Sequence, residues 1–78
     1  MGNSIILYHR EDCHLCEQAL ALLQDLGLTD SLQLLDIDSD AELGVEFGLR
    51  IPVLLRADGC ALDWPFDAQQ VQAWLQSV

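Results

Sequence analysis

Two cysteines separated by two residues, Cys13 and Cys16, are the part of the sequence best suited to chemistry. A Cys-x-x-Cys pair can exchange a disulfide with a substrate, or it can supply two thiolate ligands to a metal ion. The chain has three cysteines, so they cannot all be joined in pairs within it. In a reducing compartment, a close pair of this kind points to catalysis or metal binding rather than to a structural disulfide.

The position of the pair favours redox chemistry. Residues 5–8 form a short apolar run typical of a buried strand, and from Cys13 apolar residues recur at helical spacing until Gly27, which suits the end of a helix. At the start of that helix, Cys13 lies beside unpaired N–H groups and the positive end of the helix dipole, which favour its thiolate. We therefore expect Cys13 to attack a disulfide and the less exposed Cys16 to resolve the mixed disulfide.

Charged neighbours of the pair act in opposite directions. Arg10 and a protonated His14 would stabilise a thiolate at Cys13. Three acids would oppose it: Glu11, Asp12 and Glu17. The sequence therefore leaves open whether the pair mainly reduces or oxidises its partners.

Metal binding is the main alternative for the cysteine pair. A zinc site would need further ligands, which Cys60, His9 or His14 could supply. Zinc knuckles usually place such a pair in a turn and add a second pair, whereas here a strand leads directly into a helix. We expect no metal, and we expect Cys60 to be a small, partly buried hydrophobic residue.

The remaining pattern alternates strands and helices. Residues 32–38 read as a second strand, joined to the first by a right-handed parallel crossover. Ser39 and Glu42 match a capping box that opens a short helix, which Gly48 can close. Residues 52–56 and 60–63 read as an antiparallel hairpin.

A last helix follows the hairpin. Asp67 and Gln70 resemble a second capping box, with Phe66 and Val71 placed as a hydrophobic staple. The apolar stripe of this helix is formed by four residues: Val71, Trp74, Leu75 and Val78. The predicted order is β-α-β-α-β-β-α in one domain, residues 1–78.

Composition limits the partners. The net charge is −10, with three Arg and no Lys, and this charge repels nucleic acid and anionic membrane surfaces. No apolar run approaches the roughly 20 residues needed to cross a bilayer, and no signal-peptide pattern is visible, so we expect a cytoplasmic protein. The acids Asp36, Asp38 and Asp40 read as helix caps and solvated surface rather than as a calcium loop.

Four segments together resemble the small glutaredoxin-like family of bacterial proteins: Leu7-Tyr8, Cys13-His14-Leu15-Cys16, Asp36-Ile37-Asp38 and Arg50-Ile51-Pro52-Val53-Leu54. The resemblance implies an α/β, thioredoxin-like fold with a four-stranded mixed sheet. It also implies that Cys13 is the catalytic thiol, Cys16 the resolving thiol, and Pro52 a cis-proline packed beside the pair. No bound cofactor is implied. The implied partners are a disulfide-containing protein or glutathione as co-substrate, and a recycling reductant, with the chain acting as a monomer.

The same resemblance implies where a substrate binds. The backbone of Ile51, before the cis-proline, would pair with an extended substrate. From the residues themselves, we also expect Trp64, beside Pro65, to border the substrate groove, and Arg10 and His14 to contact the substrate. Glutathione's γ-glutamyl group would be contacted near residues 65–67. Since glutathione is anionic and this chain strongly acidic, a disulfide on a basic protein is electrostatically easier. The alternative is a non-catalytic module that binds a metal, or a peptide at Ile51-Pro52.

Overall fold

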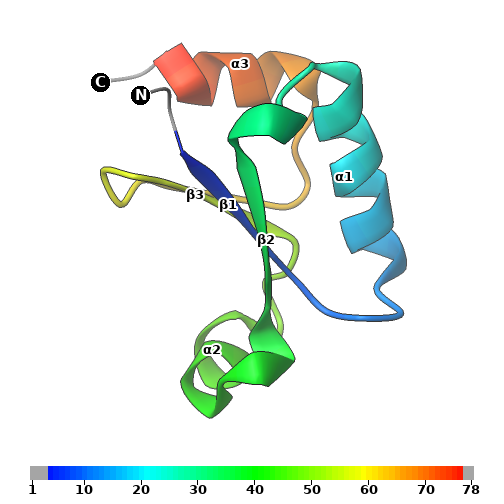
Figure 1. Ribbon diagram of the computed structural model, residues 1–78, viewed down its shortest axis with the longest axis vertical. Coiled ribbons are helices and arrows are strands. Elements are labelled where there is room, and N and C mark those ends of the chain that lie inside the picture. Colours follow the sequence, from blue (N-terminus) through cyan, green and yellow to red (C-terminus); the bar gives the residue numbers. More distant parts are fainter. Residues whose placement is uncertain (1–3, 77–78) are drawn as a thin grey trace.

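The computed structural model describes residues 4–76, which fold into a four-stranded sheet with helices on both faces (Figure 1). The strands are β1 (Ile5–His9), β2 (Leu32–Asp36), β3 (Val53–Arg56) and β4 (Ala61–Asp63). The helices are α1 (His14–Asp25), α2 (Ala41–Phe47) and α3 (Ala68–Gln76), with short 3-10 turns η1 (Thr29–Ser31) and η2 (Ile37–Ser39). The element order and the α/β class are those predicted from the sequence.

The sheet is mixed, in the order β2-β1-β3-β4. β1 runs parallel to β2 and antiparallel to β3, and β3 pairs antiparallel with β4. Tyr8 lies opposite Val53, so the end of β1 meets the start of β3. The chain therefore leaves β1 toward Cys13 at the same end of the strands at which it enters β3 from Pro52.

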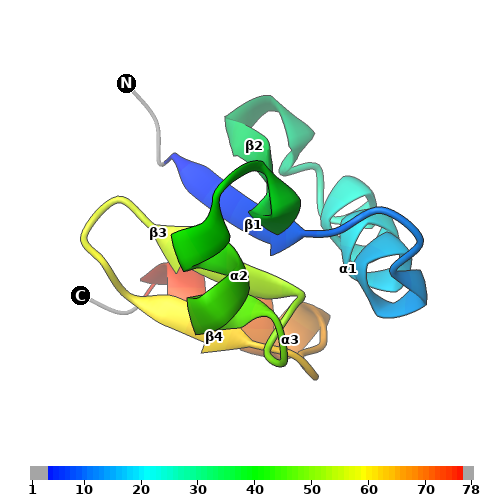
Figure 2. The same ribbon diagram turned by 90° about the horizontal axis from the view of Figure 1, so that it is seen from below.

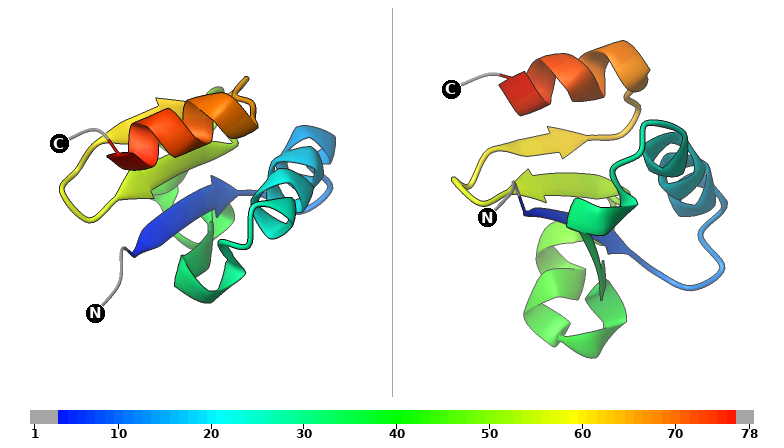
Figure 3. Two further views of the ribbon diagram at one scale, coloured as in Figure 1. Left: turned by 90° about the horizontal axis from the view of Figure 1, so that it is seen from above. Right: turned by 45° about the horizontal axis from the view of Figure 1, so that its top comes forward.

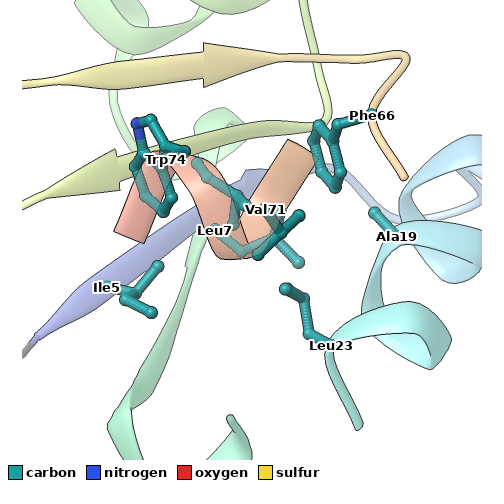
Figure 4. Close-up of a cluster of buried hydrophobic side chains, with 8 residues drawn as sticks. Ile5, Leu7, Ala19, Leu23, Phe66, Val71 and Trp74 are labelled. Carbon is teal, nitrogen blue, oxygen red and sulfur yellow. The ribbon is translucent and has the colours of Figure 1, made fainter. Parts of the chain in front are cut away.

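Each face of the sheet has its own hydrophobic cluster. Figures 2 and 3 show α2 on one side of the sheet and α3 on the other. Figure 4 shows the cluster beneath α1 and α3, whose buried members are Ile5, Leu7, Ala19, Leu23, Leu54, Phe66, Val71 and Trp74. The cluster beside α2 contains Tyr8, Ile37, Phe47 and Val53, with Tyr8 stacked on Phe47 at 4.2 Å between ring centroids. Alternation along β1 and β3 sends successive side chains to opposite clusters.

The second strand is shorter than predicted. It ends at Asp36 because the Asp36 carboxylate accepts a hydrogen bond from the Asp38 N–H at 2.8 Å and starts the turn η2. An Asp side chain that binds the backbone two residues ahead competes with strand pairing. The sequence pattern of residues 32–38 carried no signal for this early stop.

The cap of α2 also differs from the prediction. Asp40, not Ser39, is the N-cap, and its Oδ1 accepts from the Glu42 N–H at 2.9 Å. The Ser39 hydroxyl instead donates to the Asp36 carbonyl at 2.6 Å. Asp and Ser are comparable N-cap residues, so the pattern alone could not choose between neighbours. Gly48 does follow the helix end, in a right-handed conformation.

The hairpin between β3 and β4 closes as predicted, with slightly shorter strands. Gly59 has a φ of +91°, and its N–H donates to the Arg56 carbonyl at 3.0 Å. The Arg56 guanidinium, together with the Cys60 N–H, holds the pKa of the Asp58 carboxyl below its usual range. Cys60 is exposed, so the prediction of a partly buried residue is wrong, because it lies in the hairpin loop before β4 begins.

The capping box at α3 is confirmed in both directions. The Gln70 N–H donates to Asp67 Oδ1 at 2.8 Å, and the Asp67 N–H donates to Gln70 Oε1 at 2.9 Å. Trp74 on the predicted apolar stripe is buried. Val78 lies outside the described residues. Among residues 4–76, no helix has both the length and the apolar character required to cross a membrane.

Asp67→Ala is expected to lower the free energy of unfolding by about 1 kcal/mol, because the N-cap bond to Gln70 is lost. In a domain of this size the melting temperature should fall by about 4–8 °C, measured by circular dichroism. Gln69→Ala changes an exposed residue of the same helical turn and is the matched control. Equal shifts for the two variants would contradict a stabilising cap at Asp67.

Candidate functional site

Cys13 and Cys16 form a disulfide at the start of α1, with 5.2 Å between their Cα atoms. Cys13 is the N-cap residue in an extended conformation, and Cys16 lies one turn inside the helix. Cys16 is only 5% exposed, whereas Cys13 is half-buried. Cys13 is therefore the more exposed member of the pair, as the sequence predicted.

The loop that carries Cys13 turns sharply at Asp12. This residue has a φ of +58°, in the left-handed region. Asp and Asn enter that region more readily than other residues with a Cβ atom, so an aspartate fits this position. Asp12 thereby turns the chain from β1 into the first turn of α1, a role that the sequence analysis missed.

One backbone N–H group in the first turn of α1 points at the Cys13 sulfur. The Cys16 N–H donates to Cys13 Sγ at 3.2 Å, while the Cys13 carbonyl accepts from the Glu17 N–H at 3.1 Å. A donor aimed at sulfur stabilises a thiolate more than a thiol, and the helix dipole acts in the same direction. The geometry at Cys13 therefore suits a thiolate nucleophile.

A pocket of about 410 Å³ opens beside the disulfide. It lies between the loop before α1, the first turns of α1, and the edge strand β2. Its lining residues are Leu7, His9, Arg10, Glu11, Asp12, Cys13, Cys16, Glu17, Leu20 and Leu34. We call it the Cys13 pocket. It has an apolar side, to which Leu34 contributes although it is 47% exposed on β2.

The predicted site residues fall into two groups. Cys13, Cys16 and Arg10 line the Cys13 pocket, and His14 is an exposed residue that starts α1. The second group lies around the entry to β3. The Ile51–Pro52 peptide bond is cis, as is Trp64–Pro65, and the Trp64 N–H donates to the Pro52 carbonyl at 3.1 Å.

Several groups in that second region already have partners within the chain. The Ile51 N–H donates to the Phe47 carbonyl at 3.0 Å. Trp64 is half-buried and meets the ring of Phe66 edge-on at 5.0 Å between centroids, and Phe66 is core. The Asp67 N–H and carboxylate belong to the capping box. Among the positions at which the resemblance placed glutathione contacts, Asp67 therefore already has partners within the chain.

All three arginines are paired with aspartates. Arg10 Nε lies 3.1 Å and 3.2 Å from the two Asp38 oxygens, although 28 residues separate them in the chain. Arg50 binds Asp63 at 3.0 Å, and Arg56 binds Asp58 at 2.7 Å. The Asp63 carboxylate raises the pKa of Arg50 above its usual value. From the sequence, Arg10 was expected to stabilise the Cys13 thiolate and to contact the substrate. Its ion pair with Asp38 was not predicted.

A metal site is not assembled by the described part of the chain. Within residues 4–76, no three His, Cys, Asp or Glu side chains converge as a bound ion would require. Cys60, His9 and His14, which the zinc alternative offered as further ligands, therefore form no such group with Cys13 and Cys16 in this part of the chain.

Two exposed leucines were missed by the sequence analysis. Leu15, between the cysteines, is 44% exposed, and Leu34 belongs to the Cys13 pocket. An apolar residue inside the Cys-x-x-Cys segment was itself a signal of a contact surface. Leu34 gave no such signal, because only its pairing with Leu7 brings it to the site.

Comparison with known proteins gives one family and several related structures. The family model described as glutaredoxin-like domain (DUF836) matches residues 4–76. The X-ray structure of protein XcR50 from X. campestris is 44% identical, with a TM-score of 0.88, and the alignment covers 96% of this chain and 99% of that chain. The solution structure of XcR50, at the same identity, has a TM-score of 0.84 and coverages of 96% and 95%.

A second related protein is more distant. Protein Ne2328 from Nitrosomonas europaea, solved by NMR, is 28% identical with a TM-score of 0.79, and the alignment covers 97% of this chain and 94% of that chain. No curated protein matches the chain. The thioredoxin-like fold is thus shared across almost the whole length of these relatives.

Proposed function

This chain belongs to the glutaredoxin-like domain (DUF836) family, and on that premise we propose that it is a thiol–disulfide oxidoreductase acting through Cys13 and Cys16. The proposal rests on the half-buried residue Cys13. Its Sγ is bonded to Cys16 and accepts a hydrogen bond from the Cys16 N–H at 3.2 Å. A pair that closes a disulfide with its nucleophile at a helix N-terminus is suited to reversible exchange.

The reaction starts from the reduced pair. The Cys13 thiolate attacks one sulfur of a substrate disulfide, which forms a mixed disulfide and releases the other substrate sulfur as a thiolate. The Cys16 thiolate then attacks Cys13 Sγ and releases the second substrate sulfur. Two electrons pass to the substrate and the Cys13–Cys16 disulfide forms, which a separate thiol reductant must reopen.

We propose a disulfide-containing protein or glutathione disulfide as the oxidising partner. The substrate would contact the Cys13 pocket, His14, and the Ile51–Pro52 turn with Trp64 beside it. The register supports this combination, because Tyr8 opposite Val53 brings the end of β1 to the start of β3. An exchangeable pair suits a reducing compartment, and we propose the cytoplasm.

Titration of the protein against glutathione buffers tests the proposal. Across potentials of about −150 to −320 mV the pair should pass reversibly between dithiol and disulfide, with a two-electron slope of about 30 mV per tenfold change in the thiol–disulfide ratio. Alkylation and mass spectrometry should find three labels on the reduced chain and one, on Cys60, on the oxidised chain.

A Cys60→Ser variant is the control. It should show the same transition, with one alkylation label fewer in both the reduced and the oxidised state. If glutathione instead modified Cys13 and Cys16 separately, and no disulfide formed between them, the proposed function would be contradicted.

A further inference from the structure

The Cys13 pocket holds an excess of negative charge. Three carboxylates line it, those of Glu11, Asp12 and Glu17, against one guanidinium, that of Arg10, and the imidazole of His9. Arg10 is itself held by Asp38, with Nη2 and Oδ1 3.1 Å apart. A ligand that enters beside Cys13 therefore meets acids whose positive neighbour is already paired.

We infer that the disulfide reduced at this site is cationic, carried by a basic polypeptide segment whose Lys or Arg side chains lie beside Glu11 and Glu17. The inference rests on the proposed function, since it names the substrate class of the Cys13–Cys16 pair. Charge complementarity of this kind raises association rates and rejects like-charged ligands.

Within residues 4–76, an anionic disulfide meets no arginine that is without an aspartate partner. The chain contains three Arg and no Lys, and each arginine binds an aspartate at 3.1 Å or less: Arg10 with Asp38, Arg50 with Asp63, and Arg56 with Asp58. The carboxylates of glutathione disulfide would thus have to compete with an existing ion pair. They would also enter the field of a chain whose net charge is −10.

The apolar side of the pocket suits the same substrate. Leu20 and Leu34 line it beside the acids, and Leu15 is exposed between the cysteines. Lys and Arg place their aliphatic stems on apolar surface while their charged ends reach outward. Acids next to exposed leucines therefore match both parts of a basic side chain.

Three synthetic peptides with the same internal disulfide loop, flanked by two Lys, two Gln or two Glu, test the inference, together with glutathione disulfide. The reduced protein is mixed with each, and the oxidation rate constant is measured by quenching and alkylation. In about 10 mM salt, where the Debye length is about 30 Å, the Lys peptide should react at least about tenfold faster than the Glu peptide. In about 1 M salt, where the Debye length is about 3 Å, this preference should largely disappear.

A double variant assigns the preference to the pocket. Glu11→Gln with Glu17→Gln should reduce the Lys-to-Gln rate ratio about threefold to tenfold and raise the ratio of glutathione disulfide to the Gln peptide. Dividing by the Gln peptide removes any change in Cys13 reactivity. Asp25→Asn with Asp30→Asn removes the same charge from exposed positions outside the pocket and should leave both ratios within about twofold.

The outcomes separate the two claims. If the neutral Gln peptide is reduced but the Lys peptide has no advantage at low salt, the inference is overturned and the proposed function stands. If both double variants change the rate ratios equally, the preference for the Lys peptide comes from the net charge of the whole protein. That result overturns recognition by the Cys13 pocket. If no disulfide is reduced, the proposed function itself fails.

Discussion

Cys13→Ser is expected to lower the rate of disulfide reduction by at least about a thousandfold, because a serine hydroxyl is not ionised near neutral pH and cannot accept a disulfide sulfur. The N–H of Cys16, now 3.2 Å from Cys13 Sγ, would remain in place but would face the uncharged serine hydroxyl oxygen. The measurement is the turnover of a small neutral disulfide with excess reductant. Full activity in this variant would exclude the proposed mechanism.

Cys16→Ser should behave differently, because the first attack needs only Cys13. Without the resolving thiol the reaction should stop at the mixed disulfide between Cys13 and the substrate, which intact-mass spectrometry would detect as a stable adduct. Cys60→Ser, which changes the exposed hairpin cysteine, is the control and should keep the wild-type rate. If Cys60 instead formed the adduct, the assignment of Cys13 as nucleophile would be wrong.

Much of the fold was readable from the sequence because its signals are local. The capping box of Asp67 and Gln70 and the left-handed Gly27, at φ +74°, depend on residues a few positions apart. The cysteine pair was equally readable, since its spacing and its place after a strand are local facts. Errors occurred where neighbours compete for one role, as when Asp40 replaced Ser39 as the cap of α2.

The surroundings of the Cys13–Cys16 pair could not be predicted from the sequence, because they depend on contacts between segments that are distant in the chain. The Arg10–Asp38 ion pair joins residues 28 apart and decides that Arg10 is not a free cation beside the thiols. Leu34 reaches the Cys13 pocket only through its pairing with Leu7 in the parallel ladder. The proposed nucleophile can therefore be chosen from the sequence, whereas the charge and shape of the pocket beside it require the fold.

Leu54→Ala should be the most destabilising of the single substitutions proposed here. Leu54 is fully buried at 0% exposure in the cluster beneath α1 and α3. It lies in β3 between Leu7 of β1 and Leu62 of β4. Removing a buried leucine side chain costs about 2–5 kcal/mol, through lost burial and the cavity left behind.

That loss is large for this chain. At about 0.05–0.15 kcal/mol per residue, 78 residues give a total stability of about 4–12 kcal/mol. The melting temperature of the oxidised protein should therefore fall by more than about 10 °C. Urea unfolding, followed by circular dichroism with the Cys13–Cys16 disulfide kept closed, measures the change in free energy directly.

Leu49→Ala is the matched control, because it makes the same chemical change at a residue that is 104% exposed after α2. Its free energy of unfolding should stay within about 0.5 kcal/mol of wild type. Similar losses for the two variants would mean that Leu54 does not support the core as its burial indicates. A large difference would instead show that the β3 strand, whose first residue Val53 pairs with Tyr8 near the loop that carries Cys13, is anchored from the α1 and α3 face. Stability and the position of the cysteine pair would then depend on the same central strands.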